Sequence, residues 1–362
     1  MTDPPELMIV GPGALYDDEL ALIGGQMIAH FGPDWTAKHN QVVADLGTLL
    51  GAKDPPYVMP GSGTTCLDAA MMNLFEPGQR VLVFDTGFFG NRLAEIARAQ
   101  DLDVTVEPVQ IGAAIDPAAV AERARGRDGV LCTHVETSTG VRHPIREIAA
   151  AAREAGATVM IDGIASVGGE LIDVDGWGID ALVTSTQKGL ETPPGLGVIA
   201  LGEGGRARVE GRSRRPPTYY LDLRTWDWYR ENWGPWHPHP VTMPATLVLT
   251  LGSSVRRMLD VGLERWVESR ALLAARCREG LRDLGFEPVP QPGVEATMIV
   301  TAWADDPAAI QASVLEQGIL IAGGLAPLAG KTIRVGLMGR TATPQMVERV
   351  LDAIARARKE QG

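Results

Sequence analysis

Two residues of opposite charge follow short apolar runs that are typical of buried strands. Asp162 ends the run Thr158–Ile161, and Lys188 comes soon after the run Ala181–Thr184. A carboxylate at the end of a buried parallel strand is costly unless it meets a cation, a metal ion or several hydrogen-bond donors. If the two strands are neighbours, Asp162 and Lys188 face one crevice. Taken alone, each has a simpler interpretation: a turn cap for Asp162 and a solvated surface group for Lys188.

A glycine-rich segment could bind an anion at the start of a helix. The sequence P-G-S-G-T-T (Pro60–Thr65) precedes a helix-like run at Cys66–Phe75. Glycines permit a tight turn, and a helix N-terminus offers free N–H groups and the positive end of its dipole. Ser62 and Thr64 add hydroxyl donors. The segment lacks the G-x-x-x-x-G-K pattern of a P-loop, so a simple helix cap remains the alternative.

One cofactor, pyridoxal phosphate, requires these three features together. It needs an anion cradle, a lysine for a Schiff base, and an acid that keeps the pyridine nitrogen protonated. It also favours an aromatic plane stacked on its ring. Phe88 and Phe89, in the segment DTGFFG after an apolar run, could supply that plane. The residues therefore predict a pyridoxal-phosphate site around Lys188 and Asp162.

The elements expected to position these residues alternate between strands and helices. Apolar runs predict strands at Arg80–Phe84, Val104–Val109, Gly129–Thr133, Thr158–Ile161, Ala181–Thr184 and Val198–Leu201. Amphipathic stretches predict helices at Arg92–Ala99, Pro117–Ala124 and Pro144–Ala152. This alternation predicts an α/β fold with a largely parallel sheet covered on both faces. Ligands of such sheets bind at the carboxyl ends of the strands.

The second half of the chain has a different character. Residues 203–217 are basic and rich in Gly or Pro, and we expect a solvated loop over Arg206–Arg215. The tryptophan-rich stretch 226–236 is open to three interpretations: core packing, a lid over the substrate or a dimer contact. A long helical region, Ala245–Leu284, is expected to connect to a small C-terminal α/β domain. The elements predicted there are Ala296–Ala302, Pro307–Gln317, Thr332–Leu337 and Pro344–Ala355.

Composition argues against several other classes of protein. The chain has 362 residues, 45% of them hydrophobic, and its 33 basic and 45 acidic side chains leave a net charge of −12. An acidic surface repels phosphate backbones, so nucleic acid is not an expected partner. Three cysteines without a CxxC pair, and a His237–Pro–His239 pair without a carboxylate, predict no metal site. The lack of a signal peptide or a bilayer-spanning run predicts a cytoplasmic protein with no membrane partner.

Several sequence blocks resemble one enzyme family in the same order. They are GPG at 11–13, GSGT at 61–64, TGFFGNR at 86–92, ETSTGVRHPI at 136–145, IDGIASVGGELIDVDGWGID at 161–180, STQKGLETPPGLG at 185–197, YYLDL at 219–223 and RVGLMG at 334–339. The chain resembles class V aminotransferases of pyridoxal-phosphate fold type I, most closely the alanine–glyoxylate and serine–pyruvate aminotransferase group.

The resemblance implies a fold and an assembly. It implies a large domain with a mostly parallel seven-stranded sheet flanked by helices, and a small C-terminal α/β domain. The expected divisions are an N-terminal segment at 1–20, the large cofactor-binding domain at 21–260 and the small domain at 261–362. The resemblance also implies a homodimer with shared active sites.

The resemblance assigns roles around the cofactor. Lys188 would form the Schiff base and, once freed, carry the proton of the reaction, while Asp162 would pair with the pyridinium nitrogen. Phe89 takes the position of the ring-stacking aromatic, and Thr137 that of a hydroxyl residue near the ring hydroxyl. The expected phosphate ligands are Ser62, Gly63, Thr64 and Gln187.

Other implied roles concern the substrate and the second subunit. Arg334 matches the arginine that binds the substrate carboxylate, which a guanidinium can grip through two parallel hydrogen bonds. The alternative is a strand-edge arginine in a surface ion pair. Backbone groups of the Gly11–Gly13 loop, Gly13 among them, would line the substrate side. Thr242 matches a threonine that reaches the neighbouring subunit's phosphate, but His239 stands where the family often has a tyrosine.

The expected activity is transamination with ping-pong kinetics, from a small amino acid such as alanine or serine to an oxo acid such as glyoxylate or pyruvate. Lys188, Asp162 and Arg334 would equally serve a lyase, a racemase or an epimerase, so these stay alternatives. Cysteine desulfuration is disfavoured because residues 300–340 contain no cysteine. A non-catalytic binding protein on this scaffold would have no use for an amine that faces an acid.

Overall fold

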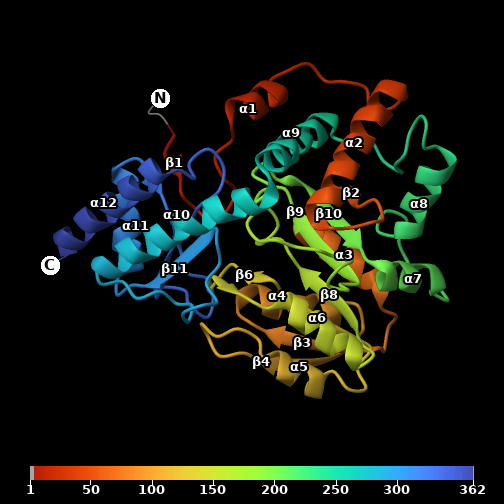
Figure 1. Cartoon of the computed structure of the whole chain (residues 1–362), viewed down its shortest axis with the longest axis horizontal. Helices are drawn as coiled ribbons and strands as arrows, with labels where there is room; N and C mark the ends of the chain where they lie inside the picture. The colour runs from red at the N-terminus through yellow and green to blue at the C-terminus, as the bar shows by residue number, and fades with distance from the viewer. Residues whose placement is uncertain (1–3, 362) are drawn as a thin grey trace.

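Within residues 4–361, which this computed structural model describes, a seven-stranded sheet forms the centre of the larger part of the chain (Figure 1). The strand order is β2-β10-β9-β8-β5-β3-β4. The strands are β2 (Tyr57–Gly61), β3 (Arg80–Asp85), β4 (Asp103–Pro108), β5 (Gly129–Thr133), β8 (Thr158–Asp162), β9 (Ala181–Ser185) and β10 (Gly195–Leu201). Neighbours pair in parallel except around β10, which is antiparallel to β2 and to β9. The expected mostly parallel α/β sheet is confirmed.

The direction of the strands decides which loops can meet. Because β2 and β9 are both antiparallel to β10, β2 runs the same way as the five parallel strands. The carboxyl ends of β2, β3, β5, β8 and β9 therefore lie at one edge of the sheet, where ligands of α/β sheets bind. Except for Thr242, which lies between α8 (Leu223–Asn232) and α9 (Ala245–Val261), the residues predicted to bind the cofactor lie at the ends of these strands or in segments that follow them.

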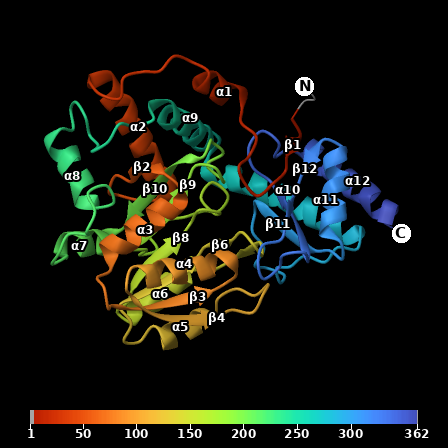
Figure 2. The same cartoon turned by 180° about the vertical axis from the view of Figure 1, so that it is seen from behind.

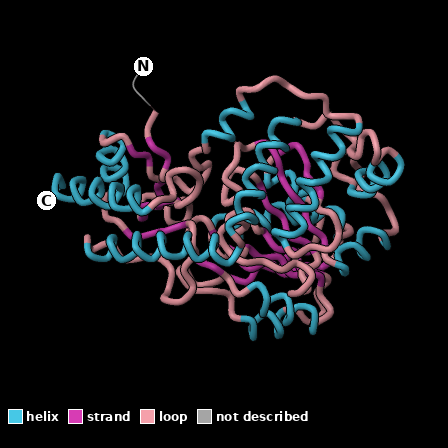
Figure 3. The backbone as a smooth tube through the Cα atoms, turned by 45° about the horizontal axis from the view of Figure 1, so that its top comes forward, coloured by secondary structure: helices cyan, strands magenta, loops and turns pink. Residues whose placement is uncertain are grey.

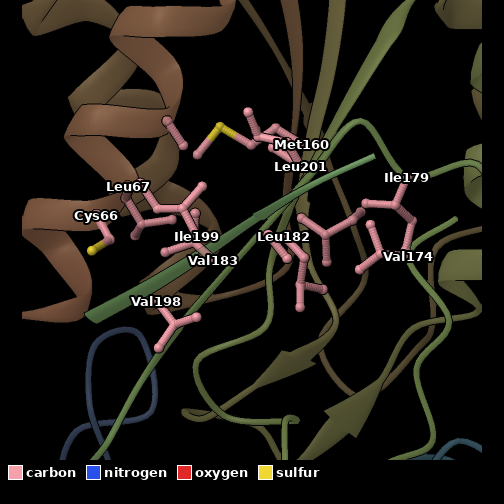
Figure 4. Close-up of a cluster of buried hydrophobic side chains, with 14 of the residues drawn as sticks. Cys66, Leu67, Met160, Val174, Ile179, Leu182, Val183, Val198, Ile199 and Leu201 are labelled. Atoms are coloured by element: carbon pink, nitrogen blue, oxygen red, sulfur yellow. The ribbon is translucent and has the colours of Figure 1, made fainter. Parts of the chain in front are cut away.

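Apolar residues on both faces of the sheet explain why it is buried. Every residue of β5, β8 and β9 is buried. Figure 4 shows side chains of β8, β9 and β10 packed with side chains from a neighbouring helix in one apolar cluster. A sheet of this kind needs a helical layer on each face, because neither face can remain in contact with water.

Helices surround the strands (Figure 3). Those of the larger part are α2 (Pro33–Leu50), α3 (Gly63–Leu74), α4 (Phe88–Ala99), α5 (Pro117–Arg123), α6 (Ile145–Glu154), α7 (Glu203–Gly211), α8 (Leu223–Asn232) and α9 (Ala245–Val261), preceded by the short α1 (Asp17–Ile23). In α6 the buried residues are Ile145, Ile148, Ala149 and Ala152, the spacing of one helical face. Among the described residues, every helix is too short or too polar to span a bilayer.

A smaller α/β part follows, seen in cyan to blue beside the larger part in Figures 1 and 2. It contains α10 (Leu263–Asp283), β11 (Ile299–Trp303), α11 (Pro307–Glu316), β12 (Ile319–Leu320), β13 (Ala322–Gly323), β14 (Thr332–Gly336) and α12 (Pro344–Gln361). β11, β14 and β13 form an antiparallel sheet, and the N-terminal strand β1 (Glu6–Leu7) pairs with β12. A two-stranded ribbon of β6 (Val135–Glu136) and β7 (Val141–Arg142) lies near the edge of the large sheet.

Buried apolar residues form separate cores in the two parts. The main cluster of the larger part extends to Trp266, and the cluster of the smaller part includes Met8 and residues from Leu273 onward. The predicted divisions at residues 20 and 260 stay predictions. Residues 1–3 and 362 of the two outer segments lie outside the described residues.

Two expectations about the second half were wrong. The region Ala245–Leu284 is two helices, because the chain turns at Gly262, whose φ of 91° a glycine adopts readily. The basic run is helical as far as Gly211, at the end of α7. Its Arg206 binds Asp54 and Asp227, which lie far away in sequence, and these ion pairs hold the helix against the body of the protein.

Candidate active site

Parallel pairing brings Asp162 and Lys188 to the same edge of the sheet. β8 and β9 are neighbours, and Asp162 lies opposite Val183 in their register. Lys188 follows three residues after Ser185, where β9 ends. The condition that the two strands are neighbours is therefore met. The charge of each side chain also shifts the pKa of the other.

Burial governs the protonation of Asp162. The side chain is 4% exposed, and its Oδ1 accepts a hydrogen bond from the Ile164 N–H at 2.9 Å. Burial raises the pKa of Asp162 to about 7, with a further increase from the charge of Glu136, while Ile164 and Lys188 oppose the rise. A cation placed against this carboxyl would favour its ionised form.

The pKa of Lys188 is shifted in the opposite direction. Burial lowers its pKa from 10.5 to about 8, and the charge of Arg334 lowers it further, while Asp162 raises it. The Nζ donates a hydrogen bond to the Val10 carbonyl. Near neutral pH the amine thus has an unprotonated fraction, which is the form that attacks a carbonyl carbon.

The predicted stacking aromatic lies within reach of this amine. Phe89 is in the first turn of α4, and the Nζ of Lys188 is 6.0 Å from the centroid of its ring. Phe88 meets Phe89 edge to face, with ring centroids 5.2 Å apart. A flat ring bound between Phe89 and the strand ends would lie beside both Lys188 and Asp162.

Glu136 fixes the start of α4, a role that the sequence analysis missed. Its fully buried carboxylate accepts hydrogen bonds from the N–H groups of Phe89 at 3.1 Å and Gly90 at 3.0 Å. The N–H and hydroxyl of Ser138 donate to the same carboxylate at 2.9 and 2.6 Å. A carboxylate satisfied this way stabilises a helix N-terminus. The available signal was an acid shortly after a buried strand: Glu136 lies three residues beyond the end of β5.

The glycine-rich segment forms both a helix cap and a cradle. Ser62 is the N-cap of α3, since its hydroxyl accepts the Thr65 N–H at 3.1 Å. A side chain at Gly63 would force its neighbours to shift: its Cβ would lie 2.4 Å from Ile164 Cδ1 and 3.0 Å from Ser185 Oγ. The Ser185 hydroxyl is buried and has no hydrogen-bond partner among residues 4–361. A buried hydroxyl beside a helix N-terminus fits an anion such as the phosphate of pyridoxal phosphate.

The other predicted phosphate ligands flank this cradle. Thr64 follows Gly63 in the first turn of α3, and Gln187 lies between Ser185 and Lys188. Both side chains are half-buried, and neither makes a hydrogen bond with the described part of the chain. Their polar groups are therefore available to a ligand.

Arg334 lies in the central strand of the small sheet, which contradicts the surface alternative. The side chain is buried; its Nε donates to the Gly323 carbonyl at 2.7 Å and its Nη1 to the Thr137 carbonyl at 3.1 Å. No carboxylate of the described residues forms an ion pair with it. Burial lowers the pKa of Arg334, and a bound carboxylate would supply the missing counter-charge.

Two glycines let the N-terminal loop approach the site. At Gly11, whose φ is 103°, a Cβ would lie 2.7 Å from Lys188 Cδ. At Gly13 a Cβ would lie 3.0 Å from the Met338 carbonyl oxygen. The loop is therefore packed on the lysine side chain and on the segment that follows β14, where the sequence predicts the substrate side.

His239 and Thr242 are not joined to this crevice by any described contact. Nε2 of His239 accepts a hydrogen bond from Trp35 at 2.9 Å, and its Nδ1 lies 2.8 Å from the Val241 carbonyl, which fixes a neutral ring. Burial lowers the pKa of His239 to about 3. Thr242 is exposed. Among residues 4–361 no group of three or more His, Cys, Asp or Glu side chains could hold a metal ion.

Comparison with known proteins identifies the family. Residues 14–350 match the model of the class V aminotransferases. The chain belongs to the class V aminotransferase family. It is 29% identical to the alanine–glyoxylate aminotransferase of Oryctolagus cuniculus, over 98% of this chain and 93% of that protein. It is 32% identical to the 2-aminoethylphosphonate–pyruvate transaminase of Burkholderia thailandensis, over 88% of each.

A solved structure agrees with the fold of this aminotransferase. The ureidoglycine–glyoxylate aminotransferase of Bacillus subtilis superposes with a TM-score of 0.93 at 27% identity. The match covers 99% of this chain and 94% of that one. The fold is therefore that of the fold type I aminotransferases, whose members depend on pyridoxal phosphate.

The lowered pKa of Lys188 can be measured in the cofactor-free aminotransferase. The chain has five lysines, so acetylation of each can be followed by mass spectrometry. We expect the labelling rate of Lys188 to reach half its maximum near pH 8, against about 10.5 in the urea-unfolded protein. In Asp162→Asn the midpoint should fall further, because the charge of Asp162 raises the pKa of Lys188. A midpoint near 10.5 in the folded protein would contradict the burial of the amine.

Proposed function

We propose that this aminotransferase binds pyridoxal phosphate and moves an amino group from a small amino acid, of the alanine or serine type, to glyoxylate or pyruvate. The observation that carries the proposal is the pair of Lys188 and Asp162 on neighbouring strand ends, with opposite pKa shifts. The names of the related proteins support the substrate class, since they include alanine, glyoxylate and pyruvate.

The cofactor fits the groups that line the crevice. When bound, pyridoxal phosphate supplies a carbonyl carbon that reacts with amines and a ring that withdraws electrons from the bond being changed. The N–H groups at the start of α3, with Ser62, Gly63 and Thr64, would hold the phosphate. The Gln187 amide and the orphaned Ser185 hydroxyl would add donors.

Lys188 and Asp162 would have different roles: Lys188 would transfer protons, and Asp162 would stabilise a positive charge. The amine of Lys188 can accept and return a proton at Nζ near neutral pH because its pKa is close to 8. The carboxyl of Asp162 would hold a cationic ring nitrogen, and the attraction is strong because the pair is shielded from water. The same amine would serve both halves of a ping-pong cycle.

Arg334 would orient the amino acid. With two donors already bound to main-chain carbonyls, its guanidinium is held in one position, and its remaining donors can bind a carboxylate. Fixing the carboxylate places the substrate amine and Cα–H near Lys188, which supplies the entropic part of the rate enhancement. Thr137, whose carbonyl holds Arg334, would lie by the ring hydroxyl.

We also propose a homodimer with shared active sites. Exposed aromatic side chains gather where the loop before α2 meets the segment after α8; we call Phe31, Trp233 and Trp236 the aromatic patch. The Phe31 and Trp236 rings are 5.4 Å apart, and those of Trp233 and Trp236 are 5.6 Å apart. An exposed patch of this kind is typical of an interface. The exposed Thr242 follows soon after it in the chain and would reach the partner's phosphate.

The transamination proposal is tested by activity and absorbance together. Purified protein loaded with pyridoxal phosphate should absorb visible light and convert amino donors with glyoxylate, pyruvate or 2-oxoglutarate as acceptor. Lys188→Ala should abolish both turnover and the lysine-dependent absorbance, because Lys188 is the lysine whose charge acts on Asp162. Ammonia release without an acceptor would favour a lyase, and full activity in Lys188→Ala would exclude the proposed role.

Replacement of Arg334 should weaken substrate binding. Arg334→Gln removes the charge and keeps much of the side-chain length. We expect kcat/KM for the amino donor to fall about 100-fold, because a hydrogen bond to a charged group contributes about 1.5–3 kcal/mol. Arg340→Gln is the matched control, since Arg340 is exposed and binds Glu6 at 3.0 Å. Equal kinetics in the two variants would mean that Arg334 is only structural.

The dimer can be tested at the aromatic patch. Sedimentation of the wild type should give about twice the 38.6 kDa mass of the chain. Trp236→Glu should shift the protein toward monomer, because a charge would be buried in the interface. Leu315→Glu, at an exposed apolar residue of α11, should leave the mass unchanged. A monomeric wild type, or the same mass in both variants, would contradict the proposed interface.

A further inference from the structure

The turn that carries Lys188 contains an unfavourable backbone conformation. The Glu191 N–H donates to the Lys188 carbonyl at 2.8 Å, which closes a turn over residues 188–191. We call this segment the lysine turn. Glu191 has a φ of 56°, in the left-handed region that residues with a side chain rarely adopt. Such a conformation persists only where surrounding contacts enforce it.

Buried polar contacts enforce the conformation of Glu191. Its carboxylate is fully buried and binds Nη2 of Arg270 at 2.9 Å. Arg270 comes from α10, and its guanidinium lies 4.3 Å from the centroid of the Trp266 ring. The second carboxylate oxygen of Glu191 accepts a hydrogen bond from the Tyr16 hydroxyl at 3.3 Å. The lysine turn is thus held from two other elements.

Tyr16 ends the loop that begins at Val10. Burial raises the pKa of Tyr16 to about 12, so its hydroxyl remains a donor. Arg257 of α9 lies 3.9 Å from the centroid of the Tyr16 ring and binds Glu19 of α1 at 2.9 Å. The tyrosine is therefore also held by a contact with α9.

The loop between Val10 and Tyr16 is attached to the lysine turn at both ends. At its start, the Val10 carbonyl accepts a hydrogen bond from Lys188 Nζ; at its end, Tyr16 binds Glu191. A chemical group bonded to Nζ would replace the first attachment, the hydrogen bond from Nζ to the Val10 carbonyl. The contact between Tyr16 and Glu191 does not use Nζ and remains.

We propose that Tyr16, Glu191 and Arg270 form a positioning unit that holds the Gly11–Gly13 loop against the lysine turn and so shapes the substrate side of the site. The proposal rests on the proposed function for its substrate, but its geometry does not use the cofactor. None of the three residues would touch the reacting atoms. They act through Gly13 and through the backbone of Lys188.

Tyr16→Phe removes one hydroxyl and keeps the ring. In the loaded enzyme we expect the KM of the amino donor to rise about tenfold with kcat within about twofold, because a loosened loop weakens substrate and transition state alike. The control is Ser253→Ala: the Ser253 hydroxyl binds Asp18 of α1 at 2.7 Å and does not contact the lysine turn. Its KM should be that of the wild type.

Hydrogen exchange tests the unit without any turnover. In purified full-length protein, with and without added pyridoxal phosphate, peptides that cover residues 10–16 should exchange faster in Tyr16→Phe than in the wild type or Ser253→Ala. The increase should be larger with the cofactor, because Nζ then no longer binds Val10. Normal exchange and normal KM in Tyr16→Phe would overturn the positioning unit.

A double-substitution cycle separates this unit from a general loss of stability. Glu191→Asn with Arg270→Met removes both charges together, and asparagine tolerates the left-handed backbone. In that background, Tyr16→Phe should have no further effect on KM or exchange. An additional tenfold effect there would overturn the unit. An inactive wild type would instead exclude the proposed function. The hydrogen-exchange result alone would then show whether the three residues form the positioning unit.

Discussion

The parallel pairing of β8 with β9 is the interaction on which the site depends. It brings an acid and an amine to one edge of the sheet, in surroundings that disfavour the charged form of each. Burial raises the pKa of Asp162 and lowers that of Lys188, while the attraction between their charged forms opposes both shifts. The pKa values that result, about 7 and about 8, are close together. Burial therefore disfavours the charged form of both groups, and the register of the sheet places them at the same edge.

The crevice also collects polar groups whose bonding capacity the chain does not use. The hydroxyl of Ser185 has no partner in the described residues, and Arg334 is held only by main-chain carbonyls. Buried groups of this kind reduce the stability of a fold unless a ligand completes their bonds. Glu136 is the contrasting case, since donors from two segments satisfy its carboxylate and it can only position its neighbours. Groups whose hydrogen bonds are satisfied, such as Glu136, thus serve as scaffold. Groups with unused hydrogen-bonding capacity are available to a ligand.

Local signals in the sequence were sufficient to predict the sheet and the placement of Asp162 and Lys188 at one of its edges. Asp162 and Lys188 could be found because each follows a run of buried residues, and the class of fold followed from the alternation of strands and helices. The role of Glu136 could not be found in this way, because two of its donors lie 46 and 47 residues earlier in the chain. The helix around Arg206 was missed for a similar reason: its composition is typical of a loop, and distant carboxylates hold it in place.

The N-terminal segment connects the two parts of the molecule at the site itself. β1 pairs with β12 of the smaller part, the Gly11–Gly13 loop then packs on Lys188, and α1 contacts α9 of the larger part. The Arg340 N–H donates to the Ala14 carbonyl at 2.8 Å, so the loop is also bound to the segment that follows Arg334. A movement of the smaller part would therefore displace the loop and Arg334 together. Because the same loop rests on Lys188, the start of the chain links the proposed substrate-binding residue to the proposed Schiff-base lysine.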